Sequence, residues 1–402
     1  MNSILNELAW DSAWAEFFAY KSTKGHLSKR DSAQLSEFIA SGAYSSVVEG
    51  ILQGKGLSIP EKKLINKMGK TSKRVVYSFS PDEMMVLKLL NFLLCRYDDK
   101  QPEGVYSFRQ GAGVHRAIKK LASMPDINHK WCYKADISNY FGSIDISLLL
   151  PILKEVLLDE PLLFAFLSEL LSCDEAIFEG TIVHEPRGVM AGTPISPFLA
   201  NLYLGELDSH FLSLGVPYVR YSDDIILFAN SKEEAEQYKN DLYRIITKYN
   251  LCINPEKEQL SSPDEGWTFL GVEFNCGKIE LSEATKSKIK GKIRRRASSL
   301  RRWMLRKNAE PKRAMGAMMR TFNSKFFDSD NANDLTWSRW FFPLVTQAEG
   351  FKEIDLYLQQ WIRWIPTGRH SKANFNISYQ ELKAMGYRSL VHEYYASMAF
   401  DA

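Results

Sequence analysis

The sequence is poor in cysteine, and its five cysteines are widely spaced along 402 residues. No two of them have the two-residue spacing of a metal-binding or redox motif. We therefore expect buried thiols in a reducing cytosol. The residues concerned are Cys95, Cys132, Cys173, Cys252 and Cys276. With 45% hydrophobic and 25% charged residues, the composition argues against a disordered or fibrous protein.

Long apolar runs are also lacking. Residues 84–95 are too few to cross a bilayer, and residues 148–173 are interrupted by charged side chains. Residues 1–18 contain acids and tryptophans where a signal peptide would have a basic start and an unbroken apolar run. The sequence therefore predicts a soluble, cytoplasmic protein without a membrane partner.

Positive charge is concentrated in one segment. Residues 286–313 hold thirteen Lys or Arg residues and one acid, although the net charge of the whole chain is only +3. Such a run is often a solvated helix face or a flexible tail. Here apolar residues recur at helical spacing, at Ile289, Ile293, Leu300, Trp303, Met304 and Leu305. We expect a helix whose basic face contacts a nucleic-acid backbone, through Lys290, Arg294, Arg295, Arg296, Arg301 and Arg302.

The pattern of polar and apolar residues predicts a helical start, a mixed middle and a helical end. Residues 1 to about 70 are expected to be helical, and Ser80 is expected to cap a helix that continues to residue 97. After residue 281, helices are expected to predominate. The elements expected between these ends are a strand at 131–137, helices at 148–172 and 197–214, two strands within 216–229, a helix at 233–249 and a hairpin over 267–281.

Two adjacent aspartates, Asp223 and Asp224, occupy the turn expected between two apolar strands. An isolated pair is most often a polar hairpin turn, because Asp is a common turn residue. Adjacent carboxylates repel each other, however, and crowded hard oxygen ligands are what Mg²⁺ requires. Asp136 lies at the end of another expected strand, where an apolar residue would be usual. A third carboxylate on a neighbouring strand would complete a divalent-cation site.

Six ordered motifs make the chain resemble the reverse transcriptase family. They are KADISNYFGSID (134–145), the Y-x-D-D box YSDD (221–224), RGVMAGTPISPFLANLYLGELD (187–208), YSFR (106–109) followed by Ala117-Ile118, NPEK (254–257) and FLG (269–271). In the third motif the matching positions are Gly192, Pro194, Ser196, Pro197, Ala200, Asn201, Leu204 and Asp208. Six matches in order are far more specific than any one of them.

The resemblance implies an α+β, right-hand polymerase fold with fingers, an antiparallel palm sheet packed on helices, and a helical thumb. The expected segments are N-terminal helices and fingers (1–130), a first part of the palm (131–150), a helical insertion of fingers or palm (151–187), the remaining palm (188–281), and a basic helical thumb with a C-terminal tail (282–402).

The resemblance also implies the catalytic groups. Two Mg²⁺ ions about 4 Å apart, replaceable by Mn²⁺, would be held by Asp136, Ile137, Asp223 and Asp224. Lys257 is a candidate proton donor to pyrophosphate, although an ordinary surface lysine is the alternative. The nucleotide-binding candidates are Lys73, Arg74 and Arg109 for the triphosphate, together with Phe141, Gly192, Ser196 and Tyr221. Phe141 is expected to exclude a ribose 2′-hydroxyl, with a plain core residue as the alternative.

Two positions depart from the family pattern. Ala191 stands where related enzymes usually have glutamine, which removes an amide near the template or nucleotide. Gly142 follows Phe141 where many bacterial relatives have aspartate. The first change bears on template preference and fidelity; the second carries no evident functional meaning.

Within the family, the chain looks most like bacterial retron-like, abortive-infection and defence-associated members. The supporting segments are YSDD, SFRQG and NFNISYQELKAMGYRSLVHEYY. No carboxylate cluster suggests a ribonuclease H, and no Cys/His group suggests an endonuclease. We expect an RNA-directed DNA polymerase that uses dNTPs and a partner noncoding RNA to make cDNA in antiphage defence. The alternatives are template-independent or protein-primed DNA synthesis, and a non-catalytic RNA-binding maturase or scaffold.

Overall fold

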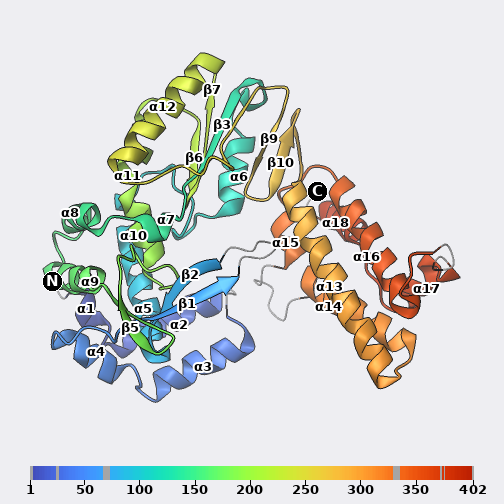
Figure 1. Ribbon diagram of the computed structural model, residues 1–402, viewed down its shortest axis with the longest axis horizontal. Helices are drawn as coiled ribbons and strands as arrows, with labels where there is room; N and C mark the ends of the chain where they lie inside the picture. Colours follow the sequence, from blue (N-terminus) through green and yellow to red (C-terminus); the bar gives the residue numbers. More distant parts are fainter. Residues whose placement is uncertain are drawn as a thin grey trace. The chain divides into compact units, whose positions relative to one another are not determined.

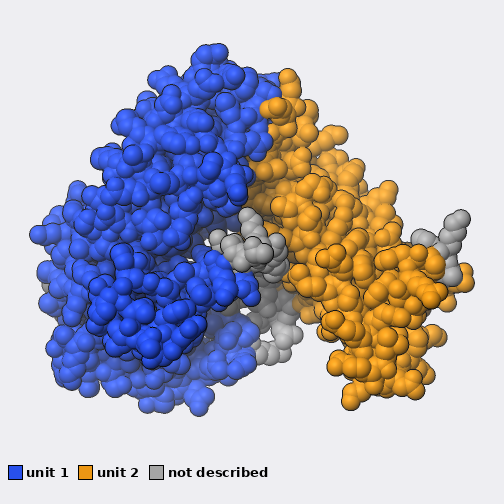
Figure 2. All heavy atoms as spheres, viewed as in Figure 1, with its two compact units in different colours: residues 1–263 blue, residues 264–402 orange. Residues whose placement is uncertain are grey.

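The computed structural model describes residues 3–23, 27–66, 73–328, 336–371, 374 and 376–400. The chain forms two compact units, Met1–Pro263 and Asp264–Ala402, shown in blue and orange in Figure 2. The five segments expected from the sequence divide the chain more finely and stay predictions. No helix in the described ranges is long and apolar enough to cross a membrane.

The first unit begins with helices and then a mixed sheet. The helices are α1 (Ile4–Glu7), α2 (Asp11–Thr23), α3 (Lys29–Ala40) and α4 (Ser45–Leu52). The sheet has the order β2–β1–β4–β5 and is formed by β1 (Glu61–Asn66), β2 (Lys73–Ser78), β4 (Glu175–Phe178) and β5 (Thr181–His184). The expected helix up to about residue 70 is therefore wrong beyond α4. Because β1 pairs with β2 and with the distant β4, its partners are set by tertiary structure.

A second sheet, which we call the central sheet, is antiparallel throughout and has the order β6–β7–β3–β8. Its strands are β3 (Trp131–Asp136), β6 (Tyr218–Tyr221), β7 (Asp224–Ala229) and β8 (Gln259–Ser261). Helix α12 (Lys232–Lys248) packs against β3 and β7, and α6 (Val114–Ala122) against β6 (Figure 1). The expected first strand, the hairpin around the aspartates and the following helix are confirmed.

The first unit also contains further helices. They are α5 (Pro81–Leu94), the 3₁₀ helices η1 (Cys95–Lys100) and η2 (Ile127–His129), α7 (Tyr140–Ser143), α8 (Ile146–Val156), α9 (Pro161–Ser172), α10 (Ser196–Tyr203) and α11 (Gly205–Ser213). Ser80 caps α5 through a capping box with Glu83, as expected. The single helix expected at 148–172 is wrong, because Pro161 lacks an amide hydrogen and starts a new helix.

The second unit combines a small antiparallel sheet with helices. Its elements are β9 (Trp267–Phe269), β10 (Val272–Asn275), β11 (Lys278–Leu281), α13 (Glu283–Lys307), α14 (Pro311–Phe326), α15 (Trp337–Phe341), α16 (Glu349–Thr367), α17 (Tyr379–Ala384) and α18 (Leu390–Phe400). Helix α13 packs on α16 and α14. Its apolar face is confirmed at Ile289, Ile293, Leu300 and Met304, whereas Leu305 is 62% exposed. The α+β fold class is confirmed by these sheets packed on helices.

Candidate active site

The three aspartates singled out from the sequence meet at one end of the central sheet. Asp136 is the last residue of β3 and Asp224 the first of β7, and the two are direct partners in the antiparallel register. Asp223 lies beside them in the tight turn from β6, where Ser222 adopts φ +60°. The amide of Ile137 donates to the carbonyl oxygen of Asp223 at 3.1 Å. Pairing of two strands thus brings together acids that are far apart in the sequence.

The aspartates repel one another in a partly desolvated setting. Burial, and after it the charges of Asp223 and Asp136, together raise the pKa of Asp224 to about 6. Burial and then the charge of Asp136 raise the pKa of Asp223. A carboxylate cluster of this kind weakens the fold unless a cation neutralises it.

Lys257 supplies the nearest positive charge. Its ammonium lies 2.5 Å from Oδ2 of Asp136, and its side chain is half exposed. Burial lowers the pKa of Lys257, but the hydrogen bond to Asp136 and the three aspartate charges outweigh burial and raise it. The turn that carries Lys257 is attached to β3, because the amide of Asn254 donates to the carbonyl oxygen of Asp136 at 2.7 Å.

The residues present fit a divalent cation by ligand chemistry. Among the described residues, no three His, Cys, Asp or Glu side chains are arranged so that they could hold a metal ion. Asp136, Asp223 and Asp224 nevertheless provide the hard oxygen donors that Mg²⁺ and Mn²⁺ prefer. Lys257 contacts Oδ2 of Asp136 in this arrangement. The assignment of Asp136, Ile137, Asp223 and Asp224 as metal ligands stays a prediction.

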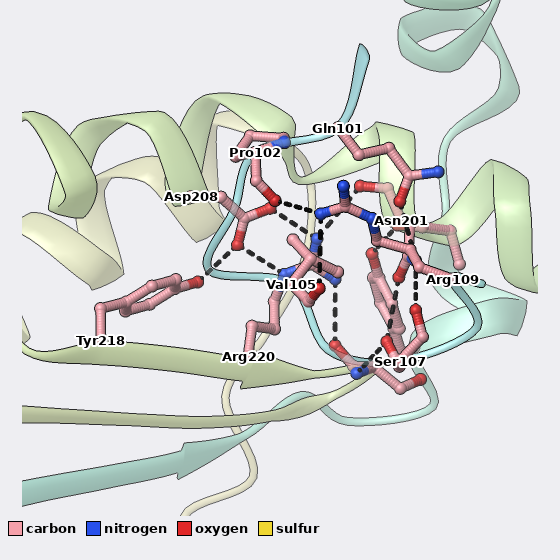
Figure 3. Close-up of polar contacts among 12 residues, drawn as sticks. Gln101, Pro102, Val105, Ser107, Arg109, Asn201, Asp208, Tyr218 and Arg220 are labelled. Carbon is pink, nitrogen blue, oxygen red and sulfur yellow. Dashed lines mark hydrogen bonds and ion pairs between the residues drawn. The ribbon is translucent and has the colours of Figure 1, made fainter. Parts of the chain in front are cut away.

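A buried ion pair next to the aspartate turn helps to hold it in place. Arg220, in β6, is fully buried and binds Asp208 of α11 through two bonds, Nε to Oδ1 at 2.8 Å and a terminal nitrogen to Oδ2 at 2.6 Å (Figure 3). The Tyr218 hydroxyl donates to the same carboxylate at 2.7 Å. The guanidinium of Arg220 also donates to the carbonyl oxygens of Asn201 and Ser222. Sequence reasoning missed Arg220, although an arginine inside an apolar strand is a signal for a buried partner.

A second set of hydrogen bonds holds the turn from the side. The amide of Ser222 donates to Oγ of Ser107 at 2.8 Å, and this hydroxyl donates to Oδ1 of Asn201 at 3.1 Å. The side-chain amide of Asn201 in turn donates through Nδ2 to Oε1 of Gln101 at 3.0 Å and to the carbonyl oxygen of Ser107 at 2.8 Å (Figure 3). Ser107 was not predicted as a site residue, and it joins the loop before α6 to the aspartate turn.

Gly192 and Ser196 shape the loop before α10. Gly192 has φ +108°, and a Cβ there would lie 2.8 Å from the carbonyl oxygen of Tyr77 in β2. Only glycine fits so close to β2. The main-chain amide of Tyr77 donates a hydrogen bond of 2.8 Å to the carbonyl oxygen of Ala191, which keeps the loop and β2 together. Ser196 is fully buried and its hydroxyl donates to the carbonyl oxygen of Met190 at 2.8 Å. Both residues therefore have a structural role here, and their contact with a nucleotide stays a prediction.

The other nucleotide-binding candidates lie on three elements. Lys73 and Arg74 are exposed at the start of β2. Arg109 is engaged with the main chain, because its terminal nitrogens donate to the carbonyl oxygens of Pro102 at 2.6 Å and Asp98 at 2.7 Å (Figure 3). It fixes its own loop in this arrangement, and a triphosphate contact stays a prediction.

Two further nucleotide candidates are aromatic. Phe141 and Tyr221 are partly buried, and both lie 6.4 Å from the ring of Phe108. Phe141 lies in α7, the first helix after Asp136, and Tyr221 directly precedes the aspartate turn. Both rings thus neighbour Phe108, and their contact with a nucleotide stays a prediction.

The six basic candidates on α13 fall into two groups. Lys290 forms an ion pair with Glu353 of α16, and Arg301 donates to the carbonyl oxygens of Ile365 at 2.7 Å and Pro366 at 2.9 Å. These two side chains therefore help to pack α13 on α16. The exposed members are Arg294, Arg295, Arg296 and Arg302. They form the basic face expected from the sequence, and nucleic-acid binding by it stays a prediction.

Comparison with protein families gives one match over more than half of the chain. Residues 60–274 match the family described as reverse transcriptase (RNA-dependent DNA polymerase). The match contains the three aspartates, Lys257 and the supporting residues Ser107, Asn201, Asp208 and Arg220.

Curated relatives match over shorter stretches. The retron Ec86 reverse transcriptase of Escherichia coli is 32% identical over 106 residues, which cover 25% of this chain and 33% of the relative. The retron Mx65 reverse transcriptase of Myxococcus xanthus is 25% identical, over 46% of this chain and 45% of the relative. Protein YkfC of Escherichia coli K12 is 24% identical, over 41% and 53%. The chain thus spans a third to about half of the length of these relatives.

Among solved structures, two telomerases are similar at low identity. Apo telomerase from Candida tropicalis, truncated from its C-terminal domain, matches 58% of each chain with 13% identity and a TM-score of 0.45. Telomerase from Candida albicans in complex with a fragment of telomeric RNA covers 88% of this chain and 71% of the relative, with 12% identity and a TM-score of 0.45.

The raised pKa of Asp224 predicts a stability that depends on pH and on metal. A carboxyl group whose pKa rises from 3.8 to about 6 on folding destabilises the folded state above pH 6, and this penalty disappears as the pH falls below about 4. Asp224→Asn should therefore stabilise the metal-free protein at pH 8 by on the order of 1 to 3 kcal/mol, and hardly at pH 4. Thermal unfolding in a chelator measures this.

Added Mg²⁺ should raise the Tm of the wild type at pH 8 and raise that of Asp224→Asn less, because the variant has lost a charged ligand. The matched control is Asp241→Asn on the surface of α12, which should respond to Mg²⁺ as the wild type does. A metal-free Asp224→Asn protein less stable than the wild type at pH 8 would contradict the repulsion.

The Arg220–Asp208 pair predicts strong energetic coupling. Arg220→Met should destabilise the protein by about 3 to 5 kcal/mol, because it leaves a buried carboxylate unpaired. Asp208→Asn combined with Arg220→Met should cost much less than the sum of the single changes. Urea unfolding of the wild type and the three variants measures this coupling. Additive losses would show that the two side chains do not depend on each other.

Proposed function

Since the chain belongs to the reverse transcriptase family, we propose that it copies RNA into DNA by two-metal nucleotidyl transfer. The observation that carries the proposal is the placement of Asp136 and Asp224 as direct partners across β3 and β7, with Asp223 in the adjoining turn. The raised pKa values of Asp223 and Asp224 support the proposal, because they mean that the fold tolerates repulsion there. Strain of this kind, held by a rigid sheet, is typical of a functional site.

The reaction joins the primer 3′-oxygen to the α-phosphorus of a dNTP and breaks the bond from that phosphorus to pyrophosphate. Two Mg²⁺ ions, when bound, lower the pKa of the 3′-hydroxyl and neutralise the triphosphate charge. Asp136, Asp223 and Asp224 would hold them. Lys257 is assigned as the proton donor to the leaving pyrophosphate, because it is protonated, half exposed and next to Asp136.

The supporting network explains how the carboxylates keep their positions. Arg220 and Ser107 hold both sides of the turn by charge-assisted and main-chain hydrogen bonds. Because both are fully buried, water does not compete for these bonds. The geometry is therefore set before substrate arrives, which is the condition for efficient positioning in catalysis.

The template and the biological role are further parts of the proposal. Two of the relatives are named as retron reverse transcriptases, which supports a noncoding RNA template, a cDNA product and a role in antiphage defence. The basic face of α13 would grip the nucleic-acid backbone. A cytoplasmic location is a further part of the proposal.

The metal ligands are tested by Asp223→Ala combined with Asp224→Ala. We expect at least a thousandfold loss of dNTP incorporation on a primed RNA, with RNA affinity within about threefold of the wild type, because only metal ligands are removed. Incorporation is measured with labelled dNTPs and Mg²⁺. The matched control is Asp174→Ala with Glu175→Ala, outside the aspartate site. Activity of the double variant within tenfold of the wild type would refute the assignment.

The same assay separates the alternatives. Incorporation without RNA would indicate template-independent synthesis, and DNA that stays attached to the denatured protein would indicate protein priming. RNA binding without any incorporation by the wild type would indicate a scaffold.

The basic face of α13 predicts binding that depends on salt and not on sequence. Neutralising Arg294, Arg295 and Arg296 together with glutamine should weaken RNA–DNA duplex binding for unrelated sequences. The slope of log affinity against log salt should flatten by up to about 0.9 per lost phosphate contact. The triple lysine variant, which keeps the charge, is the control and should retain the slope. An unchanged slope in the glutamine variant would mean that this face is only exposed to solvent and does not bind nucleic acid.

A further inference from the structure

Phe108 is a large apolar side chain that the fold leaves on the surface beside the aspartate site. It is 47% exposed and lies in the loop between η1 and α6. Its backbone adopts φ +58°, in the left-handed region that bulky residues rarely occupy. An exposed phenylalanine in an unfavourable backbone conformation gains little from folding alone, so its place calls for another explanation.

Both neighbours of Phe108 are fixed, which holds the unfavourable conformation in place. Ser107 is fully buried and bonded to the Ser222 amide and to Asn201. On the other side, Arg109 donates to two main-chain carbonyl oxygens, and the Gln110 amide donates to Asp98 at 2.9 Å. The chain is therefore fixed by hydrogen bonds on either side of Phe108, whose ring stays 47% exposed.

The ring of Phe108 lies beside two other aromatic rings, those of Phe141 and Tyr221. Its centroid lies 6.4 Å from that of Phe141, with the ring planes at 84°, and 6.4 Å from that of Tyr221, with the planes at 42°. The three rings come from different segments and form what we call the aromatic cluster. The amide of Val189 donates to the carbonyl oxygen of Phe141 at 3.0 Å, so this member is also held by the main chain.

We propose that Phe108 is a nucleotide-binding residue, whose exposed ring packs against the sugar and base of the incoming nucleoside triphosphate. This inference rests on the proposed function. The aspartates would hold the triphosphate end through metal, so the nucleoside end requires an apolar surface close by. The exposed half of Phe108 offers that surface, and aromatic rings stack on any base because every base has a π face.

Phe108 and Phe141 then have separable roles. Phe141 follows Asp136 closely and is expected to discriminate against the 2′-hydroxyl, so Phe141→Ala should lower the ratio of kcat/KM for a deoxynucleotide over its ribonucleotide by about tenfold. Phe108 contributes to binding of both nucleotides alike. Removing its ring should raise KM about tenfold for both and leave their ratio within about twofold.

Phe108→Gly is the decisive variant, because glycine adopts positive φ without strain. Relief of the backbone strain should offset part of the lost ring packing, so the variant should stay folded at the assay temperature. Thermal unfolding checks this and separates loss of the ring from loss of the fold. Phe108→Trp keeps an aromatic surface and should restore KM to within about threefold of the wild type. The assays are single-nucleotide incorporation on a primed RNA, and equilibrium binding of dTTP to the primed complex with Ca²⁺ in place of Mg²⁺.

Each outcome decides the point. A stable Phe108→Gly protein with unchanged KM, or with an altered deoxy-to-ribo ratio at unchanged KM, overturns direct contact by Phe108. Weaker dTTP binding by Phe108→Gly supports the contact even if the wild type binds dTTP without extending the primer, a result that would count against the proposed function alone. A wild type that neither binds nor incorporates dTTP overturns both.

Discussion

The buried ion pair between Arg220 and Asp208 is the interaction on which the site depends. Both side chains are fully buried, so each charge would be costly without the other. Two direct bonds, the Tyr218 hydroxyl and two main-chain carbonyl oxygens satisfy them. Because Arg220 lies two residues before Ser222, this pair ties α11 to the start of the aspartate turn. The position of the aspartate turn therefore depends on a fully buried ion pair.

The aspartates show the opposite arrangement a few residues away. Burial and mutual repulsion raise the pKa values of Asp223 and Asp224, and Lys257 forms its ion pair with Asp136. The Arg220–Asp208 pair, whose charges are fully paired, therefore supports the aspartate cluster, whose charges are not. Unfavourable interactions of this kind are typical of functional sites, where stable structure nearby compensates for them.

Close main-chain approach builds the rest of the site. Gly192 lets the loop before α10 approach β2, and Gly188 lets it approach Phe141, whose carbonyl oxygen would lie 2.2 Å from a Cβ at that position. On the other side, the pinned loop around Phe108 holds a ring outward in a left-handed conformation. Main-chain contacts thus hold the segments on both sides of the aspartate turn, and the ring of Phe108 stays exposed where we propose that a nucleoside packs.

Local signals in the sequence were sufficient for the strand ending at Asp136, the hairpin with Asp223 and Asp224, and the amphipathic helices α12 and α13. Periodicity and turn chemistry act over a few residues, so they can be read directly. Strands β1, β2, β4 and β5, the Arg220–Asp208 pair and the engagement of Lys290 and Arg301 with α16 were not foreseen. Each depends on a partner supplied by another element, and only the tertiary structure decides which groups meet and which lose water.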